Sequence, residues 1–457
     1  MTLPFNGLIC EGQSDFEVTP TQIYWLDDDI DREYKRYDQV HGTIILKYEV
    51  QGNLDMEVFK KSISFLVCRH ESLRATFHKK VTAFVMKVES PDNRVYEPEF
   101  IRDPPCDEDH YETLSNFKGH KFDVENGPLF LSRVIRRKPD LHVIAFKIHH
   151  VIFDDWSLRV LTKELFLSYG AFASGRNPPL PEPKFQYKDY LALISKSLKA
   201  NYEADRKYWS GKYSQLPPRL RIPGMKLSDV PMTERVIKKE VAFLPDGILD
   251  RVVLLSRKYG VSLFVILQAA FKYYLLKETG QRDILIGTYA FGRDYPGCDD
   301  QIGCYAKTVL IRTVLETDDS FPTCISKVER SNHDMRTRTG YPLRYFLEEL
   351  LPVGSRSGDF YWNINLQFID ERIGEEPEAG DAALKNGPSV RLLPNYYGNT
   401  LIQMDMELAF VHLRDRMQLV VHYDGASFAL EAISRLISSF STFAGELTRK
   451  YTLQSSL

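Results

Sequence analysis

The chain has 457 residues, of which 43% are hydrophobic and 26% are charged, and its formal net charge is −3. This composition is typical of a soluble globular protein, and it excludes a disordered chain or a strongly basic nucleic-acid-binding protein. A chain of this length normally forms more than one folding unit. The first 31 residues contain no Lys or Arg, and the most apolar window, 261–271, is too short to span a bilayer. We therefore expect a cytoplasmic protein that binds no membrane.

Apolar spacing predicts alternating strands and helices in the first part of the chain. Residues 43–50 and 143–148 read as strands. A helix is predicted to end near Arg69, and its apolar face is formed by Phe59, Ile63, Leu66 and Val67. A second stripe at helical spacing follows the later strand and consists of Leu158, Leu161 and Leu165. The proline-rich segment 178–183 then predicts a stiff crossing between two lobes.

The second half of the chain carries clear helix boundaries. Residues 249–259 predict a helix that ends at Gly260, since glycine readily adopts the left-handed conformation of a C-terminal cap. Ser262 is predicted to cap the N-terminus of the next helix. Residues 284–288 predict a strand, and the charged run 370–388, which contains Gly and Pro, predicts an excursion on the surface.

Two adjacent histidines stand at the end of the predicted strand 143–148. His149 and His150 are followed by Asp154, and the next helix begins shortly after it. Side chains on a strand alternate between its faces, so one imidazole can face a cavity while the other packs. A metal site is disfavoured, because adjacent histidines on a strand diverge and no third ligand stands at a zinc spacing. The pattern favours a catalytic strand-to-helix corner, and two hydrogen-bonded core histidines are the alternative.

The segment that begins with this histidine pair resembles the HHxxxDGWS signature of the condensation domains of nonribosomal peptide synthetases. Five further segments are similar to elements of that family and follow its order. They are 21–26 (SxAQxRLW), 69–77 (RHExLRTxF), 187–190 (YxDYAxW), the Gly292-Arg293 pair after strand 284–288, and 302–308 (IGxFVNT). The resemblance covers most of the chain, and the chain has the length of one such domain.

This resemblance implies a fold and an activity. The fold would be α/β, with mixed sheets in two lobes that resemble chloramphenicol acetyltransferase and form a V-shaped pseudo-dimer. We expect an N-terminal lobe at residues 1–180, which carries the histidine motif, and a C-terminal lobe at 181–457 with bridging floor-loop and latch segments. The activity would be condensation of a carrier-bound acyl or peptidyl thioester with an amine or hydroxyl, which gives an amide or ester in antibiotic and other secondary metabolism.

The resemblance also implies what the protein binds. No cofactor is expected to be bound, because phosphopantetheine arrives on the partner carrier protein. The expected partners are an acyl-loaded donor carrier and either an acceptor carrier or a free small-molecule amine or alcohol, with no nucleic acid and no membrane. We expect a monomer, and a free-standing enzyme rather than a domain excised from a larger synthetase.

Particular residues inherit roles from this family. The second histidine, His150, would act on the nucleophile as base or stabilise the tetrahedral intermediate, and His149 would support it. Asp154 would be the aspartate of the catalytic motif, and it would form a structural salt bridge with Arg293. The substrate-binding residues would be Asp155, Trp156 and Ser157, although Trp156 can equally be a packing residue beside the site.

Two residues depart from the family pattern. Asp155 replaces a glycine or alanine, and three roles are open to it. It could cap the helix that begins near Trp156, raise the pKa of His150 and favour a cationic acceptor, or close the acceptor channel of a non-catalytic member. Lys307 replaces the asparagine of IGxFVNT; we expect it to face solvent, and a change in the channel floor is the alternative.

Two other functions remain open. An acyltransferase of the same superfamily would accept a soluble acyl-coenzyme A without any carrier. A non-catalytic recruitment domain would bind a partner synthetase, and mutation of His150 would change nothing. Motif coverage beyond the histidine segment favours the condensation enzyme over the first, and the intact histidines and Asp154 favour it over the second.

Overall fold

The computed structural model describes residues 15–30, 42–81, 83–91, 96–102, 121–222, 224, 236–339, 341, 362–370, 389–392 and 404–453. Contacts within the chain divide it into two compact units. Unit 1 contains residues 1–200, 291–306 and 376–399, and unit 2 contains residues 201–290, 307–375 and 400–457. Each unit is therefore built from segments that are far apart in the sequence.

Unit 1 contains a five-stranded sheet in the order β12-β2-β7-β6-β5 and a three-stranded sheet in the order β1-β4-β3. Its strands are β1 (Phe16–Glu17), β2 (Thr43–Gln51), β3 (Ala75–Lys79), β4 (Phe84–Val88), β5 (Glu99–Arg102), β6 (Phe130–Lys138), β7 (Leu141–His149) and β12 (Ser389–Leu392). Its helices are α1 (Pro20–Ile30), α2 (Met56–Arg69) and α4 (Asp155–Ala173), with the 3-10 turns η1 (Glu71–Arg74) and η3 (His150–Ile152). Helix α5 (Tyr187–Lys212) runs from unit 1 into unit 2.

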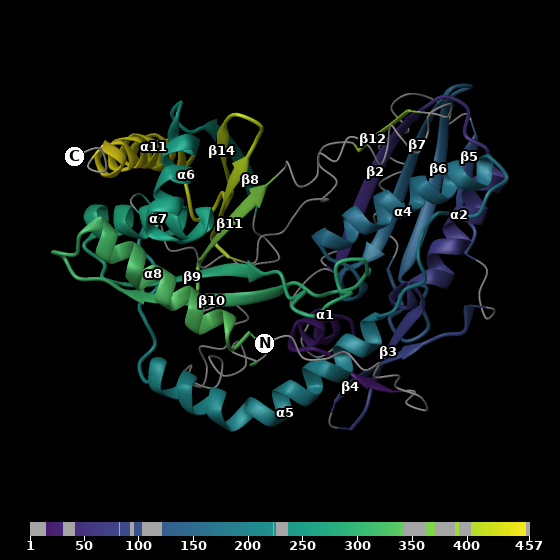
Figure 1. Ribbon diagram of the computed structural model, residues 1–457, viewed down its shortest axis with the longest axis horizontal. Coiled ribbons are helices and arrows are strands. Elements are labelled where there is room, and N and C mark those ends of the chain that lie inside the picture. The colour runs from purple at the N-terminus through teal and green to yellow at the C-terminus, as the bar shows by residue number, and fades with distance from the viewer. Residues whose placement is uncertain are drawn as a thin grey trace. The chain divides into compact units, whose positions relative to one another are not determined.

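Strand β7 lies in the middle of the larger sheet of unit 1, and this position explains its sequence. It pairs antiparallel with β2 on one side and with β6 on the other. A central strand is covered on both faces, so its residues are almost all buried. Helices α2 and α4 pack against each other beside this sheet (Figure 1), and Phe59 and Phe166 join the same core as Phe146 of β7. The histidine pair thus ends a strand whose position is fixed on both sides.

Unit 2 contains a six-stranded sheet in the order β10-β9-β11-β13-β14-β8. Its strands are β8 (Ile237–Phe243), β9 (Asp283–Ala290), β10 (Lys307–Val314), β11 (Ile364–Asp370), β13 (Met406–His412) and β14 (Met417–Asp424). Its helices are α6 (Ile248–Tyr259), α7 (Leu263–Thr279), α8 (Phe321–Arg336) and α11 (Leu430–Leu453). Strand β11 is parallel to both of its neighbours, and the other pairs are antiparallel, so the sheet is mixed.

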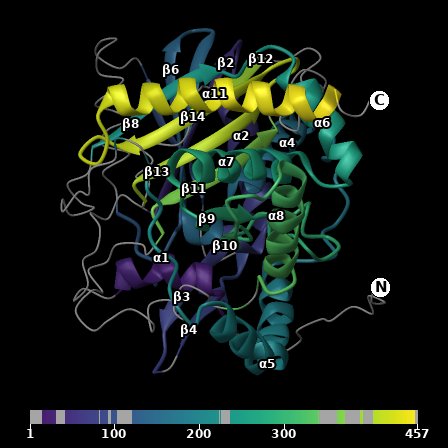
Figure 2. The ribbon, with the colours of Figure 1, turned by 90° about the vertical axis from the view of Figure 1, so that its left-hand side faces the viewer.

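The helices of unit 2 begin and end as the sequence predicts. Gly260 has φ 64° and ends α6, and the Ser262 hydroxyl accepts a hydrogen bond from the Val265 amide at the start of α7. Figure 2 shows α7, α8 and α11 in front of the strands of this sheet. Helix α7 is buried along most of its length. A helix covered on nearly every side has few polar positions, which explains why it forms the most apolar window of the sequence.

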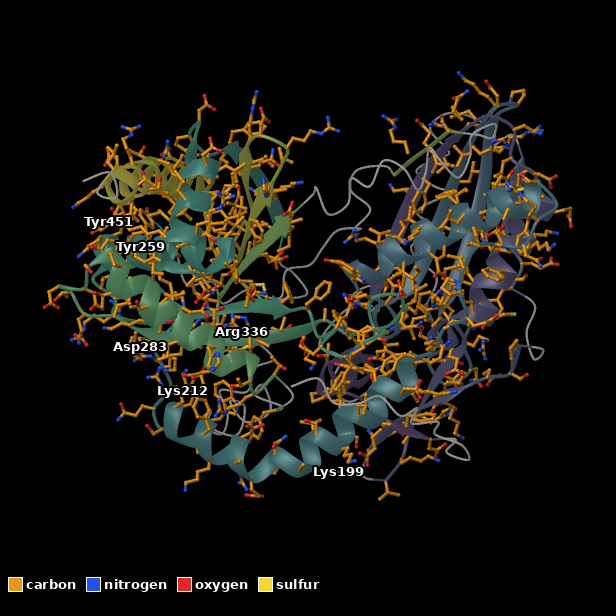
Figure 3. The ribbon with its side chains drawn as sticks, viewed as in Figure 1. Lys199, Lys212, Tyr259, Asp283, Arg336 and Tyr451 are labelled. Carbon is orange, nitrogen blue, oxygen red and sulfur yellow. The ribbon has the colours of Figure 1, made fainter. Side chains whose placement is uncertain are left out.

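The chain first passes from unit 1 to unit 2 inside a helix. Lys199 and Lys212, both labelled in Figure 3, lie on the parts of α5 that belong to unit 1 and unit 2. The proline-rich segment 178–183, predicted as the crossing, lies within unit 1. The predicted boundary after residue 180 therefore lies before α5, whereas the chain changes units within this helix, after residue 200. Most of the predicted excursion, 371–388, lies outside the described residues.

A helix that spans a membrane needs about 20 consecutive, mostly apolar residues. No single one of the described helices is long and apolar enough to cross a membrane. Helices α6 and α7 reach that length only as a pair, across a bend of 103°.

Candidate active site

The two histidines lie where β7 turns into η3. The His149 amide donates to the Leu129 carbonyl at 2.9 Å, and the His150 amide donates to the Gly42 carbonyl at 2.6 Å. The Nδ1 atom of His149 accepts a hydrogen bond from the Val151 amide at 3.1 Å. A nitrogen that accepts carries no proton, so neutral His149 is protonated on Nε2. His149 is thus the cap of the turn, as a supporting residue would be.

The His149 ring occupies a confined space in unit 1. Phe122 contacts it edge to face, with ring centroids 5.8 Å apart. A Cβ atom at Gly42 would lie only 3.0 Å from the His149 Nε2 atom. Glycine at this position therefore lets the chain pass close to the imidazole.

His150 is partly buried and has a different environment. Its Nδ1 atom is shielded from solvent and has no hydrogen-bond partner among the described residues. Burial lowers the pKa of His150 below its usual value of 6.5, while the carbonyl groups of His150 and Phe153 and the charge of Asp154 oppose this shift. A neutral imidazole carries a proton on one ring nitrogen and a free lone pair on the other, so neutral His150 keeps one nitrogen that can accept a proton.

Asp154 is the most heavily hydrogen-bonded residue of this corner and is 2% exposed. Its Oδ1 atom accepts from the Ser157 amide at 2.9 Å, the Ser157 hydroxyl at 2.7 Å and the Arg293 Nη2 atom at 2.8 Å. Its Oδ2 atom accepts from the amides of Tyr305 and Ala306 at 3.0 and 3.2 Å. A carboxylate with both oxygens engaged in this way is held firmly in place.

Arg293 reaches this carboxylate from the segment 291–306, which belongs to unit 1 although its flanks belong to unit 2. Its side chain is 0% exposed. Besides the ion pair with Asp154, its Nη1 atom donates to the carbonyls of Cys298 and Gln301, and the guanidinium lies 4.1 Å from the centre of the Tyr305 ring. The ion pair therefore fixes the segment 291–306 as well as the histidine corner.

The same segment is enclosed by aromatic rings. Tyr187 donates to the Cys304 carbonyl at 2.8 Å and contacts Tyr305 edge to face at 4.9 Å. A Cβ atom at Gly303 would lie 2.3 Å from the Tyr187 ring and 2.8 Å from the Tyr305 ring. Only glycine fits at this position without displacing the rings. The similarity of 187–190 to a family segment was visible in the sequence, but this packing role was not.

The three residues predicted to bind substrate lie at the start of α4. Ser157 is fully buried, and its hydroxyl lies 3.0 Å from the Arg293 Nη2 atom and the Gly303 amide, both of which donate to it. The Trp156 indole donates to the Asp299 carbonyl at 2.8 Å, and its ring contacts Phe291. Ser157 and Trp156 are thus engaged by protein groups, and their contact with substrate stays a prediction.

Asp155 is exposed and is the first residue of α4. The expectation that it caps this helix is wrong, because the N-cap is Asp154, whose carboxylate already accepts from the Ser157 amide. The expectation that its charge raises the pKa of His150 and favours a cationic acceptor stays a hypothesis. That pKa is lowered by burial, and the carboxylate that opposes the shift is Asp154. The closed acceptor channel stays a hypothesis.

Helix α1 contributes two contacts that sequence reasoning missed. The Gln22 side chain is buried and donates from Nε2 to the Val151 carbonyl at 3.1 Å, which ties α1 to the turn η3. The Trp25 indole stacks on the His150 imidazole, with ring centroids 4.3 Å apart and an interplanar angle of 13°. Both residues lie in the segment 21–26, so the family similarity was the signal that could have pointed to them.

The segment 69–77 also supports this corner. Arg69 and His70 contact the Glu164 carboxylate of α4 at 2.8 and 2.7 Å. The Ser72 hydroxyl donates to the Ile302 carbonyl at 2.6 Å, which adds another contact to the segment 291–306. These residues hold α2, α4 and that segment together, and they form a scaffold for the site.

Lys307 lies in unit 2, at the first position of β10. The expectation that it faces solvent is wrong, because its side chain is buried and the residue is only 7% exposed.

The described parts of the chain contain no group of three or more His, Cys, Asp or Glu residues that could hold a metal ion.

Comparison with known proteins identifies the family. A family model described as "Condensation domain" matches residues 17–455. The chain belongs to the condensation domain family. Relatives of this condensation domain include the chondramide synthase of Chondromyces crocatus, which is 26% identical over 86% of the chain. Surfactin synthase subunit 1 of Bacillus subtilis is 29% identical over 73% of the chain. The chain spans only 10% and 9% of the length of these two proteins.

Solved structures confirm the expected fold class for this condensation domain. The X-domain in complex with OxyB from teicoplanin biosynthesis has a TM-score of 0.81 at 20% identity, with 98% of this chain and 96% of that chain covered. The condensation domain of the Monacolin K polyketide synthase MokA has a TM-score of 0.74 at 14% identity, with 96% and 98% covered. The mixed α/β sheets predicted from the resemblance are thus confirmed.

Proposed function

We propose that this condensation domain joins an acyl or peptidyl thioester, carried on the phosphopantetheine arm of a carrier protein, to an amine or hydroxyl acceptor. The acceptor is either bound to a second carrier or a free small molecule. The protein needs no bound cofactor for this reaction, because the activated acyl group arrives as substrate. His150 is the residue that acts on the nucleophile.

The reaction moves one proton in two transfers, to His150 and then from it, and it requires no external reductant or oxidant. The acceptor nitrogen attacks the thioester carbonyl carbon, and a C–N bond forms while the carbonyl electrons move to oxygen. His150 Nε2 takes a proton from the attacking nitrogen. Collapse of the tetrahedral intermediate breaks the C–S bond, and the imidazolium returns the proton to the leaving thiolate. A hydroxyl acceptor follows the same steps and gives an ester.

The state of His150 is the observation that supports this role best. Burial lowers its pKa below 6.5, so the imidazole is neutral at physiological pH and can accept a proton. One nitrogen of the neutral ring keeps its lone pair, and we assign the role of proton acceptor to Nε2. A thioester is already activated, so holding this nitrogen and the acceptor in place would supply much of the acceleration.

Asp154 and Arg293 act by holding His150 in place. The five hydrogen bonds that Asp154 accepts link the start of α4 with the segment 291–306. His149 caps the turn from the strand side. We assign these three residues to positioning, because the side chain of each makes hydrogen bonds within the protein.

The decisive experiment is a condensation assay with an acyl-loaded carrier protein and a panel of amines and alcohols, with products read by mass spectrometry. His150→Ala should abolish product formation. His78→Ala is the matched control, since His78 lies on β3 and its imidazole contacts Thr76 rather than the histidine corner. Product formed equally well by the His150 variant would refute the role of this residue.

Two additional arms of the assay separate the alternative functions. Turnover of a soluble acyl-coenzyme A with no carrier present would indicate an acyltransferase of the same superfamily. Carrier binding without product for any acceptor would indicate a recruitment domain, and Asp155 would then be the first residue to replace by glycine.

A further inference from the structure

Trp25 and His150 form a stacked pair within unit 1. Their ring centroids lie 4.3 Å apart, and their planes differ by only 13°. The two rings come from different elements, since Trp25 lies on α1 and His150 begins the turn η3. Such a parallel arrangement brings one face of the imidazole against the indole and restricts rotation of the smaller ring.

Histidines that act on a substrate are usually oriented by a hydrogen bond to the ring nitrogen that faces the protein. His149 has such a bond, from the Val151 amide, and His70 has one with the Glu164 carboxylate. In His150 the corresponding Nδ1 atom is buried and has no hydrogen bond of normal geometry among the described residues, although the carbonyl groups of His150 and Phe153 act on the ring. The stack on Trp25 is a ring contact of the kind that can fix the plane of this imidazole.

The indole is itself fixed by its helix. Thr19 and Gln22 exchange two hydrogen bonds, from the Thr19 amide to Gln22 Oε1 at 3.1 Å and from the Gln22 amide to Thr19 Oγ1 at 3.2 Å. This reciprocal cap stabilises the start of α1. One turn later the same helix presents Trp25, and its indole lies close enough to the Cys304 thiol to oppose the rise in the pKa of that thiol, which burial causes.

Gln22 and Trp25 contact different parts of the turn η3. The Gln22 amide holds the backbone of η3 at the Val151 carbonyl, and the Trp25 ring covers the side chain of His150. We propose that Trp25 is a positioning residue, which fixes the plane of the His150 imidazole so that Nε2 keeps one direction toward the acceptor. This inference rests on the function proposed above and adds a residue to it.

The kinetic experiment compares two replacements of Trp25 in the condensation assay. Trp25→Leu removes the aromatic face and should lower kcat by about 10- to 100-fold with little change in KM, since a small displacement of a catalytic group has effects of this size. Trp25→Phe keeps an aromatic face and should retain most of kcat. A Trp25→Leu variant with wild-type kcat would overturn the inference, and so would an equal loss in both variants.

A control separates positioning from simple loss of stability. Ile23 lies on the same helix and packs against the core of unit 1. Ile23→Ala should lower the melting temperature and leave kcat unchanged. A fall in kcat that merely follows the melting temperature across the three variants would overturn the inference, because it would assign Trp25 a purely structural role.

A second readout needs no substrate. The NMR signals of isotope-labelled histidine, assigned to His150 by their loss in His150→Ala, report which ring nitrogen carries the proton. We expect one dominant tautomer in the wild-type protein and a mixture in Trp25→Leu. An unchanged tautomer in Trp25→Leu would overturn the positioning role alone, whereas absence of product from the wild-type protein would overturn the proposed function alone.

Discussion

Replacement of Asp154 by alanine should destabilise the protein much more than replacement of His150. The carboxylate of Asp154 is the charge partner of Arg293, whose side chain is 0% exposed. Asp154→Ala would leave this guanidinium buried without a counter-charge. It would also remove the acceptor of three backbone amides, those of Ser157, Tyr305 and Ala306.

The expected loss can be estimated from these contacts. Removal of one partner from a buried ion pair typically costs ~3–5 kcal/mol. This is a large share of the ~5–15 kcal/mol by which a folded domain is usually stable. For a folding unit of this size, each kcal/mol shifts the melting temperature by roughly 2–4 °C, so we expect a decrease of roughly 6–20 °C.

The assay is thermal and urea unfolding of Asp154→Ala, Arg293→Met and the double variant, followed by tryptophan fluorescence. The double variant should be more stable than Asp154→Ala, because it no longer buries an unpaired charge. His150→Ala should unfold close to the wild-type temperature. The reasoning fails if Asp154→Ala unfolds within 2 °C of the wild type (a threshold of about 1 kcal/mol), or if His150→Ala is the less stable protein.

Three further predictions concern pH and packing. Because burial lowers the pKa of His150, kcat/KM should fall on acidification with a midpoint below pH 6.5, and a midpoint above 6.5 in a pH–rate profile would contradict this. Gly303→Ala should cost ~1–3 kcal/mol by pressing on Tyr187, which urea unfolding would measure. Burial lowers the pKa of Lys272 to about 7, so the unfolded chain binds one more proton between about pH 7 and 10.5. Stability should therefore rise with pH across this window, and Lys272→Met should remove the dependence in unfolding measured at pH 7 and 9.5.

Local patterns in the sequence predicted the elements that carry the site. Strand β7 was predicted because a run of apolar residues marks a buried strand. Helix α6 was predicted because its apolar residues recur at helical spacing and a glycine follows its last turn. The position of His149 and His150 at a strand end followed from the same alternation. Contacts between distant segments were different, since no local pattern relates Asp154 to Arg293. That ion pair was expected only because of the family resemblance, and the structure contains it at 2.8 Å.

The predictions were wrong for residues that can take either of two local roles, because the choice between the roles depends on neighbouring parts of the structure. Asp154 and Asp155 are both good helix caps, and the choice between them depends on the backbone conformation at the end of η3. Lys307 reads as a surface residue by type, yet it begins a strand whose first position is buried. The stack of Trp25 on His150 joins residues more than a hundred positions apart, so nothing in their local sequence could indicate it.

The membership of 291–306 in unit 1 has a consequence for synthesis of the chain. Asp154 leaves the ribosome roughly 150 residues before Tyr305 and Ala306, whose amides it will accept. At about 5–20 residues per second, the nascent histidine corner waits roughly 8–30 s for the segment 291–306. During this interval the histidine corner lacks Arg293, and the carboxylate of Asp154 remains accessible to water. Shortened chains that end before residue 306 should therefore lack some of the hydrogen bonds that hold Asp154, even though the strand and the turn that carry the histidines have already been synthesised.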